Sequence, residues 1–446
     1  MKKNSSGIPL LLVLTAALLV APLCRGQAST DASPSADDLS KRVADLEKQL
    51  TALQAQLATM KQSASAPTAA APAANTAVES TPAQPSAPAK TTIASLLGPT
   101  SISGFVDGYY NYNTNQPADR LNGYRVFDTN SNNLSLNMVE LIVDKAPDAA
   151  ASRTGYHVAL GFGNAMNVVN ASDPGGLGFA QYLKEAYFSY LAPVGKGLQV
   201  DFGKFVTPMG AEVIESKDNW NYSRGLLFGY AIPFYHFGLR AKYTFNDKYN
   251  LTGFLVNGWN DIIDNNSGKT YGMSFGWNPT KKWGLTETGF WGPEQKNTNK
   301  TTRQTYDTVL TYNATSKLSL MANYDYGRGD RPVDPTTGLP IMTAPVVWWS
   351  GIAGYVKYAW NDKYSFATRY EYYDDHSGFT TGTIQHFNEF TTTFQRMVTS
   401  NLITRLEFRR DMSNEPAFLK NTNGLVKDQN TLAAGMILTF DSREAK

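Results

Sequence analysis

Residues 364–372 read Tyr-Ser-Phe-Ala-Thr-Arg-Tyr-Glu-Tyr and alternate between two kinds of side chain. Every second residue from Tyr364 to Tyr372 is aromatic or threonine, and the opposite positions include Arg369 and Glu371. Successive side chains of a β-strand point to opposite faces, so this stretch predicts a strand with one apolar and one charged face. A membrane barrel with a polar interior and a soluble sandwich with an apolar interior both contain such strands, and periodicity alone does not separate them.

The same alternation recurs along the chain. In 237–245, 318–326 and 402–408 an apolar face again lies opposite charged or amide side chains. If the apolar faces contact lipid, the charged faces line a water-filled lumen. The predicted lumen-wall residues are Glu185, Asp201, Arg240, Lys242, Asp325, Arg369, Glu371, Glu389, Arg405, Glu407 and Arg409.

Two kinds of connection separate the predicted strands. Short turns such as Asn361-Asp362 follow the even-numbered strands, and connections of about ten to thirty residues follow the odd-numbered strands. Strands that all cross one bilayer produce this alternation, so we expect an all-β fold: a closed antiparallel transmembrane β-barrel of about 16 strands. The predicted strands are 101–112, 132–145, 154–163, 180–191, 197–206, 236–246, 249–258, 270–278, 282–291, 304–313, 317–326, 347–360, 362–372, 385–399, 401–410 and 430–440.

The N-terminal residues have the pattern of a secretory signal. Lys2 and Lys3 precede an apolar stretch from Ile8 to Val20, and cleavage after Gly26 or Ala28 fits this pattern. Residues 1–26 are therefore interpreted as a signal peptide, which would remove the only cysteine, Cys24. A cysteine-free mature chain has no disulfide and no Cys-ligated metal site. A net charge of +2 gives no argument for a nucleic-acid partner.

Residues 37–60 predict a short coiled-coil helix before the barrel. Their apolar residues are spaced alternately by four and three, the period of a coiled-coil seam. Self-association is one interpretation, and an amphipathic helix lying on another surface is the other. Residues 61–92 are rich in Ala, Pro and Ser and predict an extended linker. The predicted oligomerisation residues are Leu39, Val43, Leu46, Leu50, Leu53, Leu57 and Met60.

The longest connection, 207–235, is a candidate pore constriction. Its charged side chains include Glu212, Glu215, Asp218 and Arg224, and it also carries several aromatic residues. Apolar side chains in so long a loop need a surface to pack on, and the barrel wall is the nearest one. Charges that face each other across a narrow passage select solutes by charge and size. The alternative is an extracellular loop with solvated charges.

No catalytic or metal-binding pattern stands out, so we expect no enzyme activity and no cofactor. None of the four histidines has HExxH spacing or lies beside a GxSxG turn. The acidic and amide residues Asp261, Asp264, Asn265 and Asn266 could hold Ca²⁺ weakly, but ordinary turn chemistry explains them better.

Several segments carry resemblances to known proteins. The last predicted strand ends in Gly435-Met436-Ile437-Leu438-Thr439-Phe440, which is similar to the C-terminal signal read by the bacterial outer-membrane assembly machinery. Residues 104–113 (GFVDGYYNYN), 201–212 (DFGKFVTPMGAE), 219–224 (NWNYSR) and 255–260 (LVNGWN) resemble outer-membrane β-barrel porins of the OmpL-like group, acidobacterial type. The resemblance covers about 97–440 and implies an outer-membrane barrel with porin activity but no particular substrate.

We therefore expect a porin that lets small hydrophilic solutes diffuse passively across a bacterial outer membrane, with its N-terminal helix in the periplasm. The expected partners are membrane lipid and further copies of the chain, with a trimer by analogy. Two alternatives remain at this point. The chain could be a structural envelope protein whose coiled coil contacts peptidoglycan or a partner, or an outer-membrane enzyme acting on lipid.

Overall fold

The structure, a computed structural model, describes residues 98–334 and 336–444. The predicted signal peptide, coiled-coil helix and linker (1–26, 37–60 and 61–92) lie outside these residues and stay predictions. Within the described residues, no helix has the length and apolar character needed to cross a membrane.

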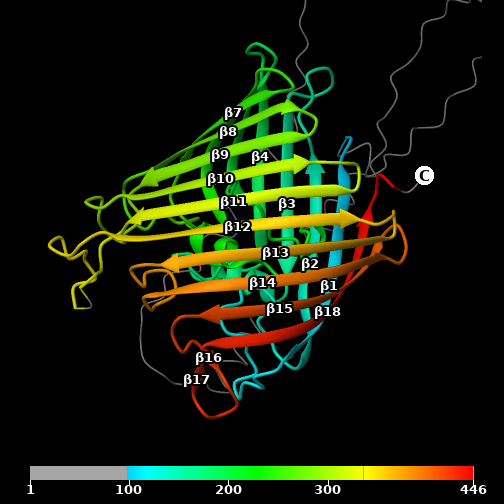
Figure 1. Cartoon of the computed structure of the whole chain (residues 1–446). Coiled ribbons are helices and arrows are strands. Elements are labelled where there is room, and N and C mark those ends of the chain that lie inside the picture. The colour runs from blue at the N-terminus through cyan, green and yellow to red at the C-terminus, as the bar shows by residue number, and fades with distance from the viewer. Residues whose placement is uncertain (1–97, 335, 445–446) are drawn as a thin grey trace, which may run out of the picture. The chain divides into compact units, whose positions relative to one another are not determined.

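Sixteen strands form a closed barrel in which every neighbouring pair is antiparallel (Figure 1). The first strand pairs with the last, Gly104 opposite Phe440, so the sheet has no free edge. The barrel strands are β1 (Ser101–Asn113), β2 (Asn133–Lys145), β3 (Thr154–Phe162), β4 (Leu183–Ala192), β5 (Leu198–Val206), β6 (Tyr235–Thr244), β7 (Tyr249–Val256), β8 (Thr270–Thr280), β9 (Trp283–Gly292), β10 (Arg303–Asn313), β11 (Leu318–Gly329), β12 (Val347–Ala359), β13 (Tyr364–Asp375), β14 (Gln385–Met397), β15 (Leu402–Ser413) and β18 (Asp428–Asp441).

The predicted barrel of sixteen antiparallel strands is confirmed, and the differences lie at strand ends. β4 begins at Leu183 and not at residue 180, because a short helix, α5 (Leu177–Ala180), precedes it. A second short helix, α4 (Asn164–Val169), lies in the same connection. Phe418–Leu419 and Leu425–Val426 form a separate small hairpin, β16–β17, which the sequence analysis did not predict. Two-residue strands are too short to give a periodic signal.

Long and short connections gather at opposite ends of the barrel (Figure 1). The short turns have a local cause in the sequence. The side chain of Asn361 accepts hydrogen bonds from the backbone N–H groups of Lys363 (2.9 Å) and Tyr364 (3.0 Å). A side-chain acceptor of this kind stabilises a tight reversal between β12 and β13.

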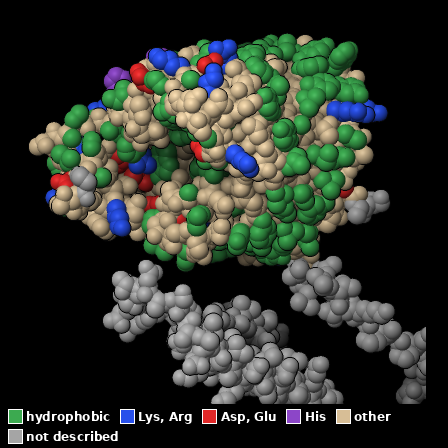
Figure 2. Space-filling view, turned by 90° about the horizontal axis from the view of Figure 1, so that it is seen from below, with side chains coloured by type: hydrophobic (Ala, Val, Ile, Leu, Met, Phe, Trp, Pro, Cys, Tyr) green, Lys and Arg blue, Asp and Glu red, His purple; other side chains and the backbone are tan. Residues whose placement is uncertain are grey.

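The two faces of the barrel differ in chemistry. Large apolar side chains such as Leu406 and Met436 are exposed on the outside, and the opposite positions of the same strands are buried and mostly polar. Figure 2 shows hydrophobic side chains gathered over the outer side, and a hollow with charged side chains toward the end with the long connections. An apolar exterior and a polar interior are typical of a barrel whose outer face contacts lipid.

Candidate functional site: a loop folded against the inner wall

The connection 207–234 between β5 and β6 lies inside the barrel. Its backbone and side chains form hydrogen bonds with inner-face residues of β1, β13, β14 and β15. The loop contains a short 3₁₀ turn, η1 (Ser216–Asp218), and a single π-helical turn, η2 (Leu227–Ala231). We call this segment the inner loop.

Apolar packing holds the second half of the inner loop. Leu226 and Leu227 are fully buried, and they belong to one apolar cluster with Phe127 of the connection after β1 and Trp349 of β12. The Trp349 indole N–H also donates a hydrogen bond to the Ala231 carbonyl (3.1 Å). Burial of such side chains stabilises by about 1.5–3 kcal/mol each, so this cluster favours a loop inside the barrel over one in solvent.

Arg369 on β13 connects the wall to the inner loop. Its guanidinium donates to the carboxylates of Glu389 on β14 (2.9 Å) and of Glu212 in the loop (2.6 Å), and to the Ser223 carbonyl (2.8 Å). Arg369, Glu371 and Glu389 are all fully buried, and Glu371 lies directly opposite Glu389 across β13 and β14. Like charges in register repel each other, so Arg369 offsets the repulsion while it fixes the loop.

Glu407 and Arg405 on β15 hold the middle of the loop. The Glu407 carboxylate accepts the backbone N–H groups of Tyr222 (2.6 Å) and Ser223 (3.0 Å). Arg405 donates to the carbonyls of Ser216 (2.7 Å), Asn221 (3.0 Å) and, through its second terminal nitrogen, Asn219 (2.7 Å). A carboxylate bound to N–H groups and a guanidinium bound to carbonyls satisfy the backbone of an irregular segment that has no sheet partner.

Arg409 and Asp107 complete the attachment. Arg409 on β15 donates to the Arg224 carbonyl (2.6 Å). Asp107 on β1 accepts the Tyr222 hydroxyl (2.8 Å) and the Ser216 hydroxyl (2.6 Å). The inner loop is therefore bound on both sides of the seam between the first and last strands.

The four predicted constriction residues all lie on the inner loop, but in different surroundings. Glu212 is buried against Arg369, and the Arg224 guanidinium bonds to carbonyls of its own loop, including that of Tyr222 (2.8 Å). Glu215 pairs with Lys184 of β4. The Asp218 side chain is 54% exposed and pairs with Lys217 (2.5 Å). Of the four charges, that of Asp218 has the freest access to solvent.

The predicted wall residues divide into two groups. Those of β13, β14 and β15 belong to the attachment of the inner loop described above. Arg240 pairs with Asp201 (2.6 Å) on the neighbouring β5, and its guanidinium lies over the rings of Tyr187 and Phe205. Asp325 on β11 faces Asp307 on β10 in register. The remaining two are Glu185, which accepts the Val206 N–H (3.0 Å), and Lys242, which is exposed.

The wall formed by β7, β8 and β9 is different from that of β13 to β15. Thr252, Ser274 and Thr288 lie side by side in register across these three strands. The hydroxyls of Ser274 and Thr288 lie 2.9 Å apart. The row that these three strands present to the lumen therefore consists of neutral hydroxyl groups and contains no charged side chain.

Asp107, Lys184 and the pairing of Lys217 with Asp218 were not predicted from the sequence. Asp107 occupies the inner face of β1 in strict alternation, so the strand pattern contained the signal that identifies it. Lys184 lies at the start of β4, where the predicted strand began three residues too early, at 180. The pairing of Lys217 with Asp218 depends on the turn η1, which has no periodic signature.

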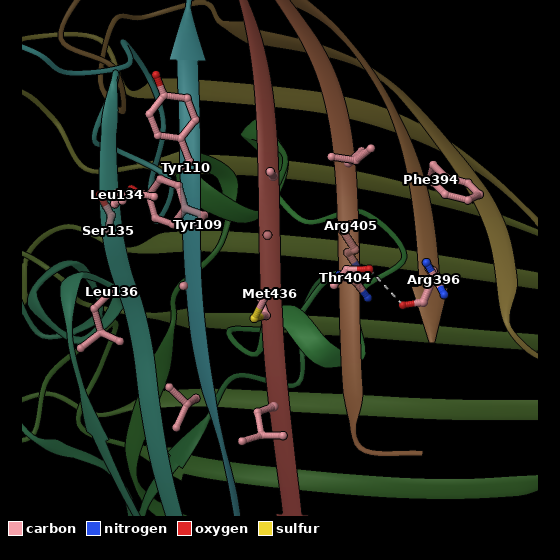
Figure 3. Close-up of a pocket in the computed structure, with 16 residues that line it drawn as sticks. Tyr109, Tyr110, Leu134, Ser135, Leu136, Phe394, Arg396, Thr404, Arg405 and Met436 are labelled. Carbon is pink, nitrogen blue, oxygen red and sulfur yellow. Dashed lines mark hydrogen bonds between the residues drawn. The ribbon is translucent and has the colours of Figure 1, made fainter. Parts of the chain in front are cut away.

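A separate hollow of about 1030 Å³ lies on the outer wall, over β14, β15, β18, β1 and β2. Figure 3 shows Leu136, Met436, Phe394 and Arg396 around it, on three of these strands. Small residues such as Gly108 form part of its lining. This hollow belongs to the apolar exterior and not to the lumen.

The chain is similar in fold to solved outer-membrane barrels at low sequence identity. These include OmpT of Vibrio cholerae in a trimer form (12% identity, TM-score 0.51), an anion-selective porin from Comamonas acidovorans (11%, 0.50) and the outer-membrane channel DcaP of Acinetobacter baumannii (10%, 0.50). Each match covers 76% of this chain. The same matches cover 99%, 99% and 97% of the three solved chains, in the order given. No curated protein matches the chain.

A family model decides the classification, because it matches residues 99–440 and so spans all sixteen barrel strands except the last residue of β18. The family is described as "Putative beta-barrel porin-2, OmpL-like". The expected resemblance is thus confirmed over the predicted range, and the chain belongs to this family of outer-membrane β-barrel porins.

Proposed function

We propose that the inner loop is the constriction of a passive diffusion channel for small hydrophilic solutes, and that no reaction is catalysed. The observation that carries this proposal is the attachment of the loop to the inner wall by Arg369, Arg405, Glu407 and Arg409. A segment fixed across part of a lumen narrows the passage and sets which solutes cross it.

Single-channel recording in a planar bilayer with asymmetric KCl tests the channel. We expect discrete conductance steps from the purified barrel, and a reversal potential that gives its charge preference. Liposome swelling with sugars of increasing size gives the width of the passage. Failure of even the smallest sugars to enter would contradict a diffusion pore and favour the structural envelope role.

We also propose that the barrel forms a homo-oligomer, as the trimer form of Vibrio cholerae OmpT does. The outer hollow supports this, since its small lining residues between larger ones give a second subunit a surface to fill. The predicted coiled coil at 37–60 would add to this association from the periplasm, where we place the N-terminal helix. Contact with peptidoglycan is a further role for the same helix.

Native electrophoresis in mild detergent tests the oligomer. Replacing Leu46, Leu50 and Leu53 together by Asp removes part of the predicted seam, so we expect a looser oligomer and an intact barrel. A wild-type protein that migrates as a monomer would contradict the proposed association.

A further inference from the structure

Two carboxylates from different connections face each other near the end of the barrel with the long connections. Asp261 follows β7, and Glu294 follows β9. The position that a Cβ atom would take on Gly258 lies 2.8 Å from Glu294 Oε2 and 3.1 Å from Asp261 Oδ2. The two oxygens are therefore within about 6 Å of each other, across a gap that only a glycine leaves open.

Hydrogen bonds do not fully satisfy the buried carboxylate of Asp261. Its residue is 3% exposed, and its Oδ2 has no hydrogen-bond partner among residues 98–334 and 336–444. A buried carboxylate oxygen without a partner is costly, because it loses its hydration and gains no hydrogen bond in exchange. Of the two carboxylates, Glu294 is the better satisfied, since it accepts the Trp259 N–H (2.8 Å) and the Thr270 hydroxyl (2.6 Å).

The positively charged side chains near Asp261 and Glu294 already form ion pairs with other residues. Arg303 is the cation that acts on both carboxylates, and it forms an ion pair with Asp330. Lys269 pairs with Asp264. Burial, followed by the charge of Glu294, raises the pKa of Asp261 to about 8. Burial also raises the pKa of Glu294 to about 7. The two carboxyls therefore resist being ionised together, and a cation bound between them would stabilise their ionised forms.

A third connection joins the same place. Asp173, in the connection between β3 and β4, accepts the Ile262 N–H (3.1 Å) and the Tyr235 hydroxyl (2.6 Å). It adds negative charge close to Asp261 and ties the connection after β3 to the connection after β7. Neutralising this charge would therefore affect three connections together.

We propose that Asp261 and Glu294 bind one divalent, oxygen-preferring cation such as Ca²⁺, which fastens the connection after β7 to the connection after β9. Ca²⁺ takes six to eight oxygen ligands at about 2.3–2.6 Å, so two oxygens share one ion when they lie no more than about 5.2 Å apart, a separation inside the upper bound of about 6 Å that the Gly258 position sets. In the part of the chain that the structure describes, no three acidic, histidine or cysteine side chains converge on one metal position. Backbone carbonyls and water complete the coordination.

Terbium luminescence excited through tryptophan tests this site on the purified full chain in detergent, with Ca²⁺ as competitor. We expect one Ca²⁺-displaceable Tb³⁺ per chain. The double variant Asp261→Asn/Glu294→Gln removes both charges and keeps the side-chain shapes, and it should lower Tb³⁺ affinity at least about tenfold. Glu415→Gln, which removes an exposed carboxylate from the connection after β15, should leave the affinity unchanged and serves as the matched control.

Gly258→Ala provides a second variant in which both carboxylates remain. Its methyl group would occupy the gap between the two oxygens, so Tb³⁺ affinity should fall without any change of charge. Heat-modifiable electrophoretic migration shows whether each variant is a folded barrel. A wild type that binds no displaceable Tb³⁺, or folded variants that bind it as the wild type does, would overturn the proposal, and neither result depends on channel conductance.

Discussion

The inner wall of β13 to β15 and the inner wall of β7 to β9 occupy the same barrel but carry opposite chemistry. The first presents buried Arg and Glu side chains that bind the inner loop, and the second presents Thr252, Ser274 and Thr288, which are neutral. Charged residues on the inner face of a barrel strand therefore need not face the solute. In this protein they serve first to satisfy the backbone and carboxylates of a segment that has no strand partner.

The largest effect should follow from Arg369→Gln. The change leaves Glu212, Glu371 and Glu389 buried without their shared counter-charge, which costs about 3–5 kcal/mol. We expect the inner loop to detach, with a lower thermal midpoint and a larger single-channel conductance. Arg410→Gln is the control, because Arg410 forms an exposed pair with Asp428 that contributes at most about 1 kcal/mol. Equal effects of the two variants would remove the distinction between the walls.

A smaller effect is expected from Glu407→Gln. The amide keeps one acceptor for the N–H groups of Tyr222 and Ser223 but loses the negative charge, at a cost of about 1–3 kcal/mol. Limited proteolysis should detect the change as faster cleavage within 216–224. Glu287→Gln on the exposed face of β9 is the control and should be cleaved as the wild type is. Unchanged proteolysis of both variants would show that Glu407 does not hold the loop.

The neutral wall should tolerate substitution. Ser274→Ala together with Thr288→Val removes both partners of one hydroxyl contact, which leaves no orphaned group and changes the free energy of unfolding by less than about 1 kcal/mol. Denaturant unfolding in detergent measures this. A loss as large as that of Arg369→Gln would mean that the two walls contribute equally to stability.

The smallest structural effect should come from Asp218→Asn. The side chain of Asp218 is 54% exposed, so its replacement should leave the thermal midpoint unaltered. We expect the change to act only on the electrostatic field in the passage beside the inner loop. We expect a modest shift of the reversal potential in asymmetric KCl towards anions. Asp334→Asn, in the connection after β11, is the control for a lost charge outside the inner loop. An unchanged reversal potential would place Asp218 outside the conduction path.

The sequence by itself determined the barrel. A period of two, strands of about ten residues and alternating connection lengths are local properties of the chain, and they predict the number of strands and the inner face that carries Arg369 and Glu407. The start of β4 and the hairpin β16–β17 could not be predicted as well, because short helices and two-residue strands have no periodic signal.

Only the tertiary structure decided which partner each charged side chain has and how far it is exposed to solvent. Glu212 and Asp218 are six residues apart and look equivalent in the sequence, yet the first is buried against Arg369 and the second is open to solvent. Likewise, Asp261 and Glu294 meet only because β7, β8 and β9 are neighbours in the barrel. The surroundings of a charge depend on segments distant in sequence, so barrel closure and the path of the inner loop set its partners.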